Sequence, residues 1–305
     1  MTVRIATRGS MLALWQANHV KAELERRDPG LAVELLVLKT RGDLIVDRPL
    51  SEVGGKALFV KEIEEALIDR RAHIAVHSMK DVPAELAPGL AVVAIPERED
   101  PRDALVLRPG LEAVSVATLP RGARVGTSSL RRLCQLLATR PDLVVEPLRG
   151  NVDTRLARVA RGDFDAIVLA CAGLRRLGYG SRIACALDPV ESLPAVGQGA
   201  LALECRADDS GTRARLAVMD HAPTARAVTA ERAALVRLQG SCQTPLAAFA
   251  VEEGGALRLR GLVGTTDGVT ILRADQRGRD PQALGDAVAD ALLAQGAAAL
   301  LAKPT

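Results

Sequence analysis

The feature that most constrains the fold is an alternation of strand and helix patterns. Residues 3–6 and 33–38 have the apolar character of buried strands, and the helical pattern of residues 12–27 lies between them, with Ser10 in position to cap it. A strand, a helix and a second strand in that order form a parallel crossover unit. The sequence therefore predicts an α/β fold built on a parallel sheet.

The alternation is interrupted twice. Residues 96–103, with two prolines and six charges, follow the strand pattern of residues 91–95. A second alternation leads to another such segment, residues 192–199, before the strand pattern of residues 201–204. Segments of this kind make poor cores and good domain crossings. We therefore expect two parallel-sheet domains that are joined by a double crossing.

Beyond about residue 220 the pattern changes. One helical pattern is followed by three alternating strand patterns, at residues 246–253, 256–264 and 269–277, and by an Ala/Leu-rich helical pattern over about 282–302. This order predicts a small third domain of the α+β class.

Composition excludes several classes of protein. Aromatic residues make up 2% of the 305 residues, too few for the stacking surfaces of single-stranded nucleic-acid binders. No apolar run approaches the ~18 residues of a membrane span, and the N-terminus has no signal-peptide pattern. The four histidines have no metal-ligand spacing and CxxC is absent, so we expect no metal site. Five scattered cysteines predict reduced thiols and a cytoplasmic protein.

Polar segments follow several of the predicted strands. In parallel sheets, ligands bind beyond the carboxyl ends of the strands. The segments are Thr7–Ser10, Ser78–Asp81, Gly126–Ser129 and Arg149–Asn151. Hydroxyls and free backbone N–H groups at the helix start after Gly126 suit an anion, although Ser and Thr there can also be a plain N-cap. Because six of the 40 basic residues are lysines and 34 are arginines, the combination favours a cleft for a polyanion.

Asp81 and Cys242 have two interpretations each. In a basic cleft, Asp81 is either a salt-bridge partner or the group that stabilises a cation. Cys242 lies on a loop bracketed by Gly240 and Pro245. It is either a structural cysteine, as most are, or an accessible and reactive thiol.

Eight motifs in this order resemble the porphobilinogen deaminase (hydroxymethylbilane synthase) family over essentially the whole chain. They are Thr7–Ser10 (TRGS), Val53–Lys56 (VGGK), Ala75–Pro83 (AVHSMKDVP), Glu97–Asp103 (EREDPRD), Gly126–Arg132 (GTSSLRR), Leu148–Val152 (LRGNV), Leu193–Gly199 (LPAVGQG) and Leu238–Cys242 (LQGSC). The resemblance implies two parallel-sheet domains of the type II periplasmic-binding-protein fold and a small α+β third domain. Its domains would be residues 1–96 with 197–217, residues 103–191, and residues 220–305.

The resemblance also implies an activity. The family condenses four porphobilinogen molecules, with loss of ammonia, onto a dipyrromethane cofactor and releases a linear tetrapyrrole for haem biosynthesis. By its place in LQGSC, Cys242 corresponds to the thioether anchor of that cofactor, and Asp81 to the catalytic aspartate that stabilises an azafulvene cation. The resemblance further implies a monomer with porphobilinogen as its substrate and with no nucleic-acid or membrane partner.

The remaining candidate residues would bind the carboxylates of the cofactor and the substrate. They are Arg8, Ser10, Lys80, Thr127, Ser128, Ser129, Arg131, Arg132, Arg149, Arg155 and Arg176. Gln16, Lys56 and Phe59 are lesser candidates for a pocket or lid, with Phe59 favoured as a core residue. Two positions depart from the family: Gly9 stands where many relatives have Gln, and Asp153 where Gly is common.

Two rival classes share part of this pattern. A solute-binding protein has the double crossing but needs no reactive loop thiol, and usually carries an export signal. The ligand-sensing part of a regulator needs a DNA-binding segment, which the sequence does not suggest.

Overall fold

The computed structural model describes residues 2–40, 60–241 and 244–302 of the chain. Its contacts divide the chain into two compact units, which are described separately below. The first unit comprises residues 1–98 and 200–225, and the second comprises residues 99–199 and 226–305. The expected division into three domains with the boundaries given above stays a prediction.

The first unit contains a five-stranded sheet with the order β2-β1-β3-β10-β4. Its strands are β1 (Thr2–Arg8), β2 (Ala32–Leu38), β3 (Ile74–Ser78), β4 (Leu90–Ala94) and β10 (Leu201–Arg206). β1 pairs in parallel with β2 and β3, whereas β10 runs antiparallel to both β3 and β4. The crossing strand β10 is therefore inserted, in the reverse direction, between two strands made much earlier in the chain.

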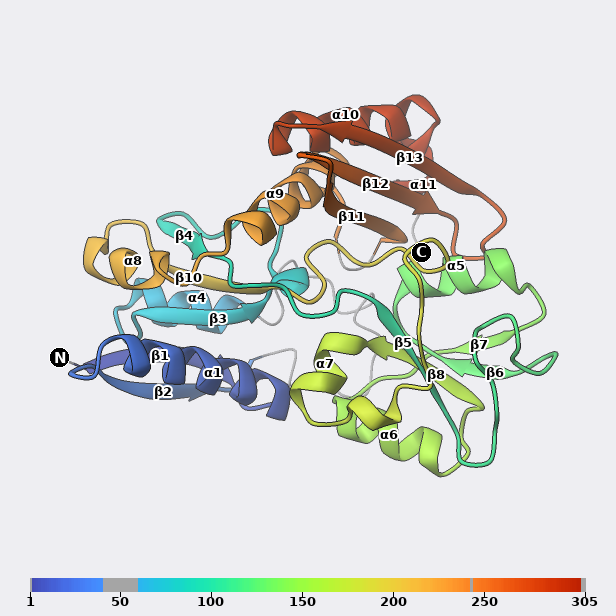
Figure 1. Ribbon diagram of the computed structural model, residues 1–305, viewed down its shortest axis with the longest axis horizontal. Coiled ribbons are helices and arrows are strands. Elements are labelled where there is room, and N and C mark those ends of the chain that lie inside the picture. Colours follow the sequence, from blue (N-terminus) through green and yellow to red (C-terminus); the bar gives the residue numbers. More distant parts are fainter. Residues whose placement is uncertain (1, 41–59, 242–243, 303–305) are drawn as a thin grey trace. The chain divides into compact units, whose positions relative to one another are not determined.

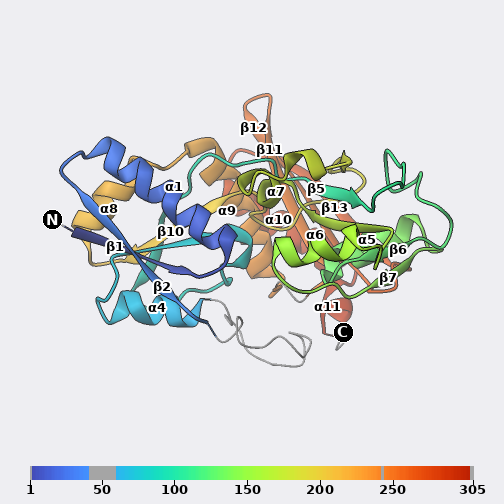
Figure 2. The ribbon, with the colours of Figure 1, turned by 90° about the horizontal axis from the view of Figure 1, so that it is seen from below.

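Helices cover both faces of this sheet. α1 (Met11–Arg27) and α8 (Ser210–Ala217) bury Val20 and Leu216 against one face, with Ile5 and Val33 of the sheet. α4 (Lys61–Ile68) packs on the opposite face, and Figure 2 shows α1 and α4 on either side of the sheet. The predicted helix start is confirmed, because Ser10 Oγ accepts a hydrogen bond from Ala13 N at 3.3 Å.

The second unit contains a sheet of the same design, with the order β7-β6-β8-β5-β9. Its elements are β5 (Asp103–Leu107), β6 (Arg124–Gly126), α5 (Leu130–Thr139), β7 (Val144–Glu146), α6 (Val152–Ala160), β8 (Ala166–Ala170), α7 (Cys171–Arg176) and β9 (Cys185–Ala186). Here too the crossing strand, β5, is antiparallel to its neighbours, while β6 pairs in parallel with β7 and β8.

The two crossing segments are in contact at Glu99 and Gly199. The backbone N–H of Glu99 donates to the carbonyl oxygen of Gly199 at 3.2 Å. Gly199 has a φ of +89°, and a Cβ there would collide with the carbonyl oxygen of Glu99. A glycine is therefore required where the two crossings run past each other.

The second unit also includes a three-stranded antiparallel sheet, β11 (Leu246–Glu253), β12 (Ala256–Gly264) and β13 (Ile271–Gly278). α10 (Pro281–Ala294) and α11 (Ala297–Leu301) contact it, and α9 (Ala222–Arg237) precedes it in the chain (Figure 1). The predicted α/β class is thus confirmed, with two parallel-rich sheets and a small sheet-and-helix part that follows them in the chain.

Two elements differ from the prediction. Residues 103–107 form β5, although Asp103 was placed in a polar crossing, because its charge is neutralised inside the protein as described below. The single C-terminal helix is in fact two, since Gly296 adopts a φ of +97° between α10 and α11. None of the helices in the described ranges is long and apolar enough to cross a membrane.

Candidate active site

In the first unit, the ends of β1 and β3 open onto a small cavity. Parallel neighbours end at the same edge of a sheet, so Arg8 at the end of β1 and Ser78 at the end of β3 are brought together. The cavity has a volume of about 70 Å³. Its polar lining consists of Thr7, Arg8, Ser10, Gln16, His77, Ser78 and Asp81. Four of the predicted site residues, Arg8, Ser10, Gln16 and Asp81, therefore meet at one place.

The cavity side chains differ in how firmly they are held. Gln16 is buried and its Nε2 donates to Ser78 Oγ at 2.8 Å, which fixes one wall. Asp81 ends the short 3₁₀ turn Met79–Asp81 and is exposed. Within the described ranges, no hydrogen bond or ion pair holds the Asp81 carboxylate. That carboxylate is available to a ligand, whereas Gln16 is part of the scaffold.

The other predicted residues of this part of the chain are Lys80, Lys56 and Phe59. Lys80 is half-buried and is not part of the lining. Lys56 and Phe59 lie outside the described residues, so their predicted roles stay predictions.

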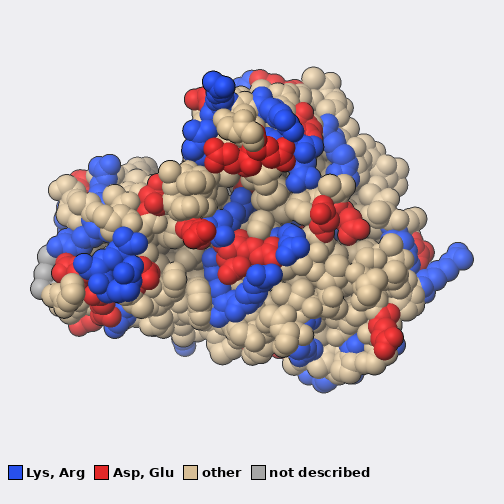
Figure 3. Space-filling view, in the orientation of Figure 1, with Lys and Arg blue, Asp and Glu red and all other residues tan. Residues whose placement is uncertain are grey.

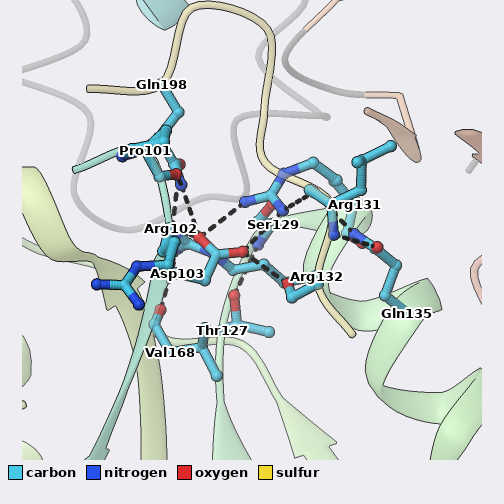
Figure 4. A network of polar contacts seen from close by, with 12 residues as sticks. Pro101, Arg102, Asp103, Thr127, Ser129, Arg131, Arg132, Gln135, Val168 and Gln198 are labelled. Atoms are coloured by element: carbon cyan, nitrogen blue, oxygen red, sulfur yellow. Dashed lines mark hydrogen bonds and ion pairs between the residues drawn. The ribbon is translucent and has the colours of Figure 1, made fainter. Parts of the chain in front are cut away.

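In the second unit, Arg131 and Arg132 both bind the buried carboxylate of Asp103 (Figure 4). Arg131 Nη1 and Nη2 donate to Asp103 at 2.7 and 3.0 Å, and Arg132 Nε and Nη2 donate at 2.9 and 2.7 Å. Ser192 Oγ and Gln198 Nε2 also donate to this carboxylate, at 2.8 and 2.9 Å. Asp103 therefore accepts six hydrogen bonds from four side chains, and it is fully buried.

Burial alone would raise the pKa of the Asp103 carboxyl, but the guanidinium groups of Arg131 and Arg132 outweigh it and hold that pKa well below its usual range. The carboxylate is ionised, and the cluster of three charged groups has a net charge of +1. A buried charge is tolerated when it is paired and hydrogen-bonded in this way.

The cluster also ties the second crossing segment to the sheet. Arg131 Nη1 donates to the carbonyl of Leu193 at 2.7 Å, and Arg132 Nη1 donates to the carbonyl of Val168 at 3.0 Å. Both arginines thus have a structural role. Their predicted binding of ligand carboxylates stays a prediction. One donor, Arg131 Nε, has no hydrogen-bond partner in the described chain and could serve that role.

Thr127, Ser128 and Ser129 lie just before the start of α5. Ser128 Oγ donates to the carbonyl of Leu148 at 3.0 Å, and Thr127 Oγ1 accepts from Ser129 N at 3.2 Å. Ser129 precedes α5, but its side chain does not cap the helix. The plain N-cap interpretation therefore fails at this residue.

The remaining arginines differ in their surroundings. Arg155 Nε donates to Gly150 O, and Arg176 Nη2 donates to Gly199 O, each at 2.7 Å. Burial lowers the pKa of Arg176 to about 10. Arg149 Nη1 is buried and meets no hydrogen-bond partner among the described residues. A buried donor of this kind suits an anionic ligand.

The departure at Asp153 has a local explanation. Its carboxylate accepts a hydrogen bond of 2.7 Å from the hydroxyl of Tyr179, the one tyrosine of the chain. Asp153 is therefore paired with Tyr179, which follows the end of α7, and not with the arginines near the start of α6. The structure gives no corresponding account of Gly9.

Four of the five thiols belong to regular secondary structure. Burial raises the pKa of Cys134 and of Cys205 to about 11 and that of Cys171 to about 12, and it also raises the pKa of Cys185. Such thiols are poor nucleophiles because the thiolate is disfavoured. Cys242 lies outside the described residues.

Sequence reasoning missed three contributors to these sites. Asp103 was assigned to a charged crossing, although the apolar run that follows it is a signal for a strand start. The roles of His77 and Glu204, which are buried together beside the cavity, had no signal in the spacing. No group of three or more His, Cys, Asp or Glu residues suited to a metal occurs in the described part of the chain.

Two family models match the chain. The model described as porphobilinogen deaminase, dipyromethane cofactor binding domain, matches residues 3–214, and the model of the porphobilinogen deaminase C-terminal domain matches residues 225–294. These matches cover nearly the whole sequence and both the cavity and the buried cluster. The chain belongs to the porphobilinogen deaminase family.

Solved structures with a partial likeness are periplasmic domains and receptors. The periplasmic VFT2 domain of Bordetella pertussis BvgS is 21% identical, with a TM-score of 0.42 over 71% of this chain and 85% of that one. The Escherichia coli aliphatic sulphonate binding protein SsuA is 17% identical, with a TM-score of 0.41 over 78% and 70%. The L-cystine receptor of Neisseria gonorrhoeae is 13% identical, with a TM-score of 0.40 over 72% and 84%.

Proposed function

We propose that this chain is a hydroxymethylbilane synthase, a transferase that condenses four porphobilinogen molecules stepwise with loss of ammonia. The proposal rests above all on the match of both family models across the chain. The cavity of the first unit supports it, because a cation, hydroxyls and an available carboxylate line one small space. The product of this reaction is a linear tetrapyrrole, hydroxymethylbilane, and the proposed setting is porphyrin biosynthesis by a cytoplasmic monomer.

The described residues fit a dipyrromethane cofactor. Its acetate and propionate groups are anions, and Arg149 offers a buried donor that no described residue satisfies. When bound, the cofactor supplies a tethered primer, which makes each addition an intramolecular event. The residues proposed to bind the carboxylates of the cofactor and the substrate are Arg8, Ser10, Lys80, Thr127, Ser128, Ser129, Arg131, Arg132, Arg149, Arg155 and Arg176.

Asp81 has the catalytic role in this proposal. Porphobilinogen becomes a cation when it loses ammonia, and a cation beside Arg8 requires a compensating negative charge. The Asp81 carboxylate lines the same cavity as Arg8 and carries no bond within the described chain. Charge that is placed in advance where charge develops is an efficient way to lower a barrier.

Cys242 is proposed as the covalent anchor, through a thioether. The four other thiols are disfavoured because burial raises the pKa of each. The mass of the intact protein tests this assignment: it should exceed the mass of the sequence by two linked pyrrole units, and peptide mapping should place the excess on the peptide that contains Cys242. Cys242→Ala should fold, have the mass of its sequence, and give no colour with a reagent that detects pyrroles.

A matched control is Cys185→Ala, which removes a half-buried thiol and should keep the added mass. An adduct on Cys134, or an active protein with no added mass, would exclude the anchor. A solute-binding protein, the main rival, would bind porphobilinogen reversibly and release it unchanged.

A further inference from the structure

His77 and Glu204 form a buried pair against the wall of the cavity. His77 Nε2 lies 2.8 Å from Glu204 Oε2, and both side chains are almost fully buried. His77 also lines the cavity that contains Asp81. The pair therefore connects the cavity to the interior of the first unit.

The pairing of β3 with β10 explains this contact. Glu204 stands opposite Ala75 in the antiparallel ladder, and His77 stands opposite Ala202. Side chains two residues apart point to the same face of a sheet, so His77 and Glu204 share one face. α4 covers this face and adds Glu64, which is also buried and whose pKa is raised by burial and by the charge of Glu204.

The tautomer of the imidazole follows from the charge of Glu204. An ionised carboxylate only accepts hydrogen bonds, so beside an ionised Glu204 the Nε2 atom donates and Nδ1 keeps its lone pair. Within the described residues, Nδ1 of His77 has no hydrogen-bond partner. An imidazole held in this way by a carboxylate is ready to accept a proton at Nδ1.

We propose that His77 is the base that removes a proton from the pyrrole ring during chain growth, and that Glu204 is the positioning residue that fixes its tautomer. The inference rests on the proposed function. In the reaction, the C–N bond of porphobilinogen breaks and ammonia leaves with the bonding pair. A C–C bond then forms at the free α-carbon of the receiving pyrrole, whose hydrogen departs as a proton to His77 Nδ1. The imidazolium returns that proton to ammonia or water.

The different roles of Asp81 and His77 follow from their different environments. Asp81 is exposed and compensates positive charge, and an ionised carboxylate is a weak base. A histidine is a more suitable acceptor near neutral pH, because the best catalytic base has a pKa close to the working pH. The charged and titratable groups that face His77 are Glu64 from α4, Glu204 from β10, and Arg8 and Asp81 across the cavity.

The experiment compares single additions of porphobilinogen to His77→Gln and to wild type. Each protein is first charged with porphobilinogen that carries deuterium at its free α-carbon, so that the receiving pyrrole carries the deuterium. The rate in His77→Gln should fall on the order of a hundredfold. Its deuterium isotope effect should exceed the wild-type value, because proton removal becomes slower than the other steps.

A second variant and a spectroscopic measurement keep the test independent of folding. Glu204→Gln still accepts from Nε2 but lacks the charge, so it should lose roughly tenfold in rate. In the full-length wild-type protein, ¹⁵N shifts of the His77 ring should show a protonated Nε2 and a bare Nδ1. His73→Gln, which alters a histidine four residues away that does not line the cavity, serves as the control.

Two outcomes would overturn the inference: an Nδ1–H tautomer, or an unchanged isotope effect in a folded His77→Gln protein. If wild type makes no tetrapyrrole from porphobilinogen at all, the proposed function fails instead. The two failures are therefore distinguishable.

Discussion

In the first sheet, Leu201 stands opposite Ser78, the last residue of β3, and in the second sheet Asp103 stands opposite Ala170, the last residue of β8. These positions are equivalent, because each is at or near the start of the antiparallel crossing strand of a sheet with the same strand order. One sheet places an apolar residue there and the other a carboxylate.

The difference decides how each unit uses its polar residues. The carboxylate of Asp103 binds Arg131 and Arg132, and the three side chains form a buried ion cluster at that edge of the sheet. Leu201 attracts no such partner, and the edge beside it remains a cavity with Asp81 exposed on its wall. The same topology thus supports one edge built for stability and another that is open to a ligand.

The largest effect should come from Asp103→Asn. This change leaves two buried guanidinium groups without their counter-charge, and breaking a buried ion pair in this way costs about 3–5 kcal/mol. Urea unfolding should measure that loss. Asp290→Asn is the control, because its pair with Arg237 is exposed and should contribute less than about 1 kcal/mol. A loss for Asp103→Asn no larger than that of the control would contradict the structural role.

The difference in stability between wild type and Asp103→Asn should depend on pH. The pKa of Asp103 is lower in the folded protein than its ordinary value of 3.8. Its stabilising contribution is therefore complete above pH 3.8 and is lost as the pH falls further. The difference in stability between wild type and Asp103→Asn should be constant from pH 5 to 7 and should narrow below pH 3.8.

Asp81→Asn should affect turnover strongly and stability little, the opposite of what is expected for Asp103→Asn. Since the Asp81 carboxylate has no partner in the described chain, stability should change by less than about 0.5 kcal/mol. Turnover should fall by about a hundred- to a thousandfold, while substrate and cofactor still bind. Asp81→Glu should retain more activity than Asn. Single-turnover rates, cofactor content and melting temperatures measure these effects, and a melting temperature that falls in parallel with activity would favour the salt-bridge alternative.

The smallest effect is expected for Tyr179→Phe. It removes the hydrogen bond to Asp153 and nothing else, at a half-exposed site. The melting temperature should fall by roughly 1–3 °C, with no change in turnover. If turnover falls by more than tenfold while the protein stays folded, Asp153 and Tyr179 belong to the binding machinery of the second unit after all.

The sequence predicted the first unit better than the second for a physical reason. The cavity residues Arg8, Ser10 and Asp81 follow or begin elements with strong local signals, and parallel strands bring their ends together. The Asp103 cluster depends on contacts between residues 28 and 89 positions apart. A charged residue in a charged segment predicts exposure, and only the tertiary fold reveals that two arginines neutralise it.

The reversed direction of β10 has a consequence for how the protein is made. β10 lies between β3 and β4, so β4 has no adjacent strand until residues 201–206 have been synthesised. A ribosome needs roughly 5–20 s to make the residues between β4 and β10 at ~5–20 residues per second. The strands of the second sheet all lie within residues 103–186. The N-terminal sheet, although translated first, is therefore the later of the two to close, and its apolar β4 is the segment that a chaperone would meet on the nascent chain.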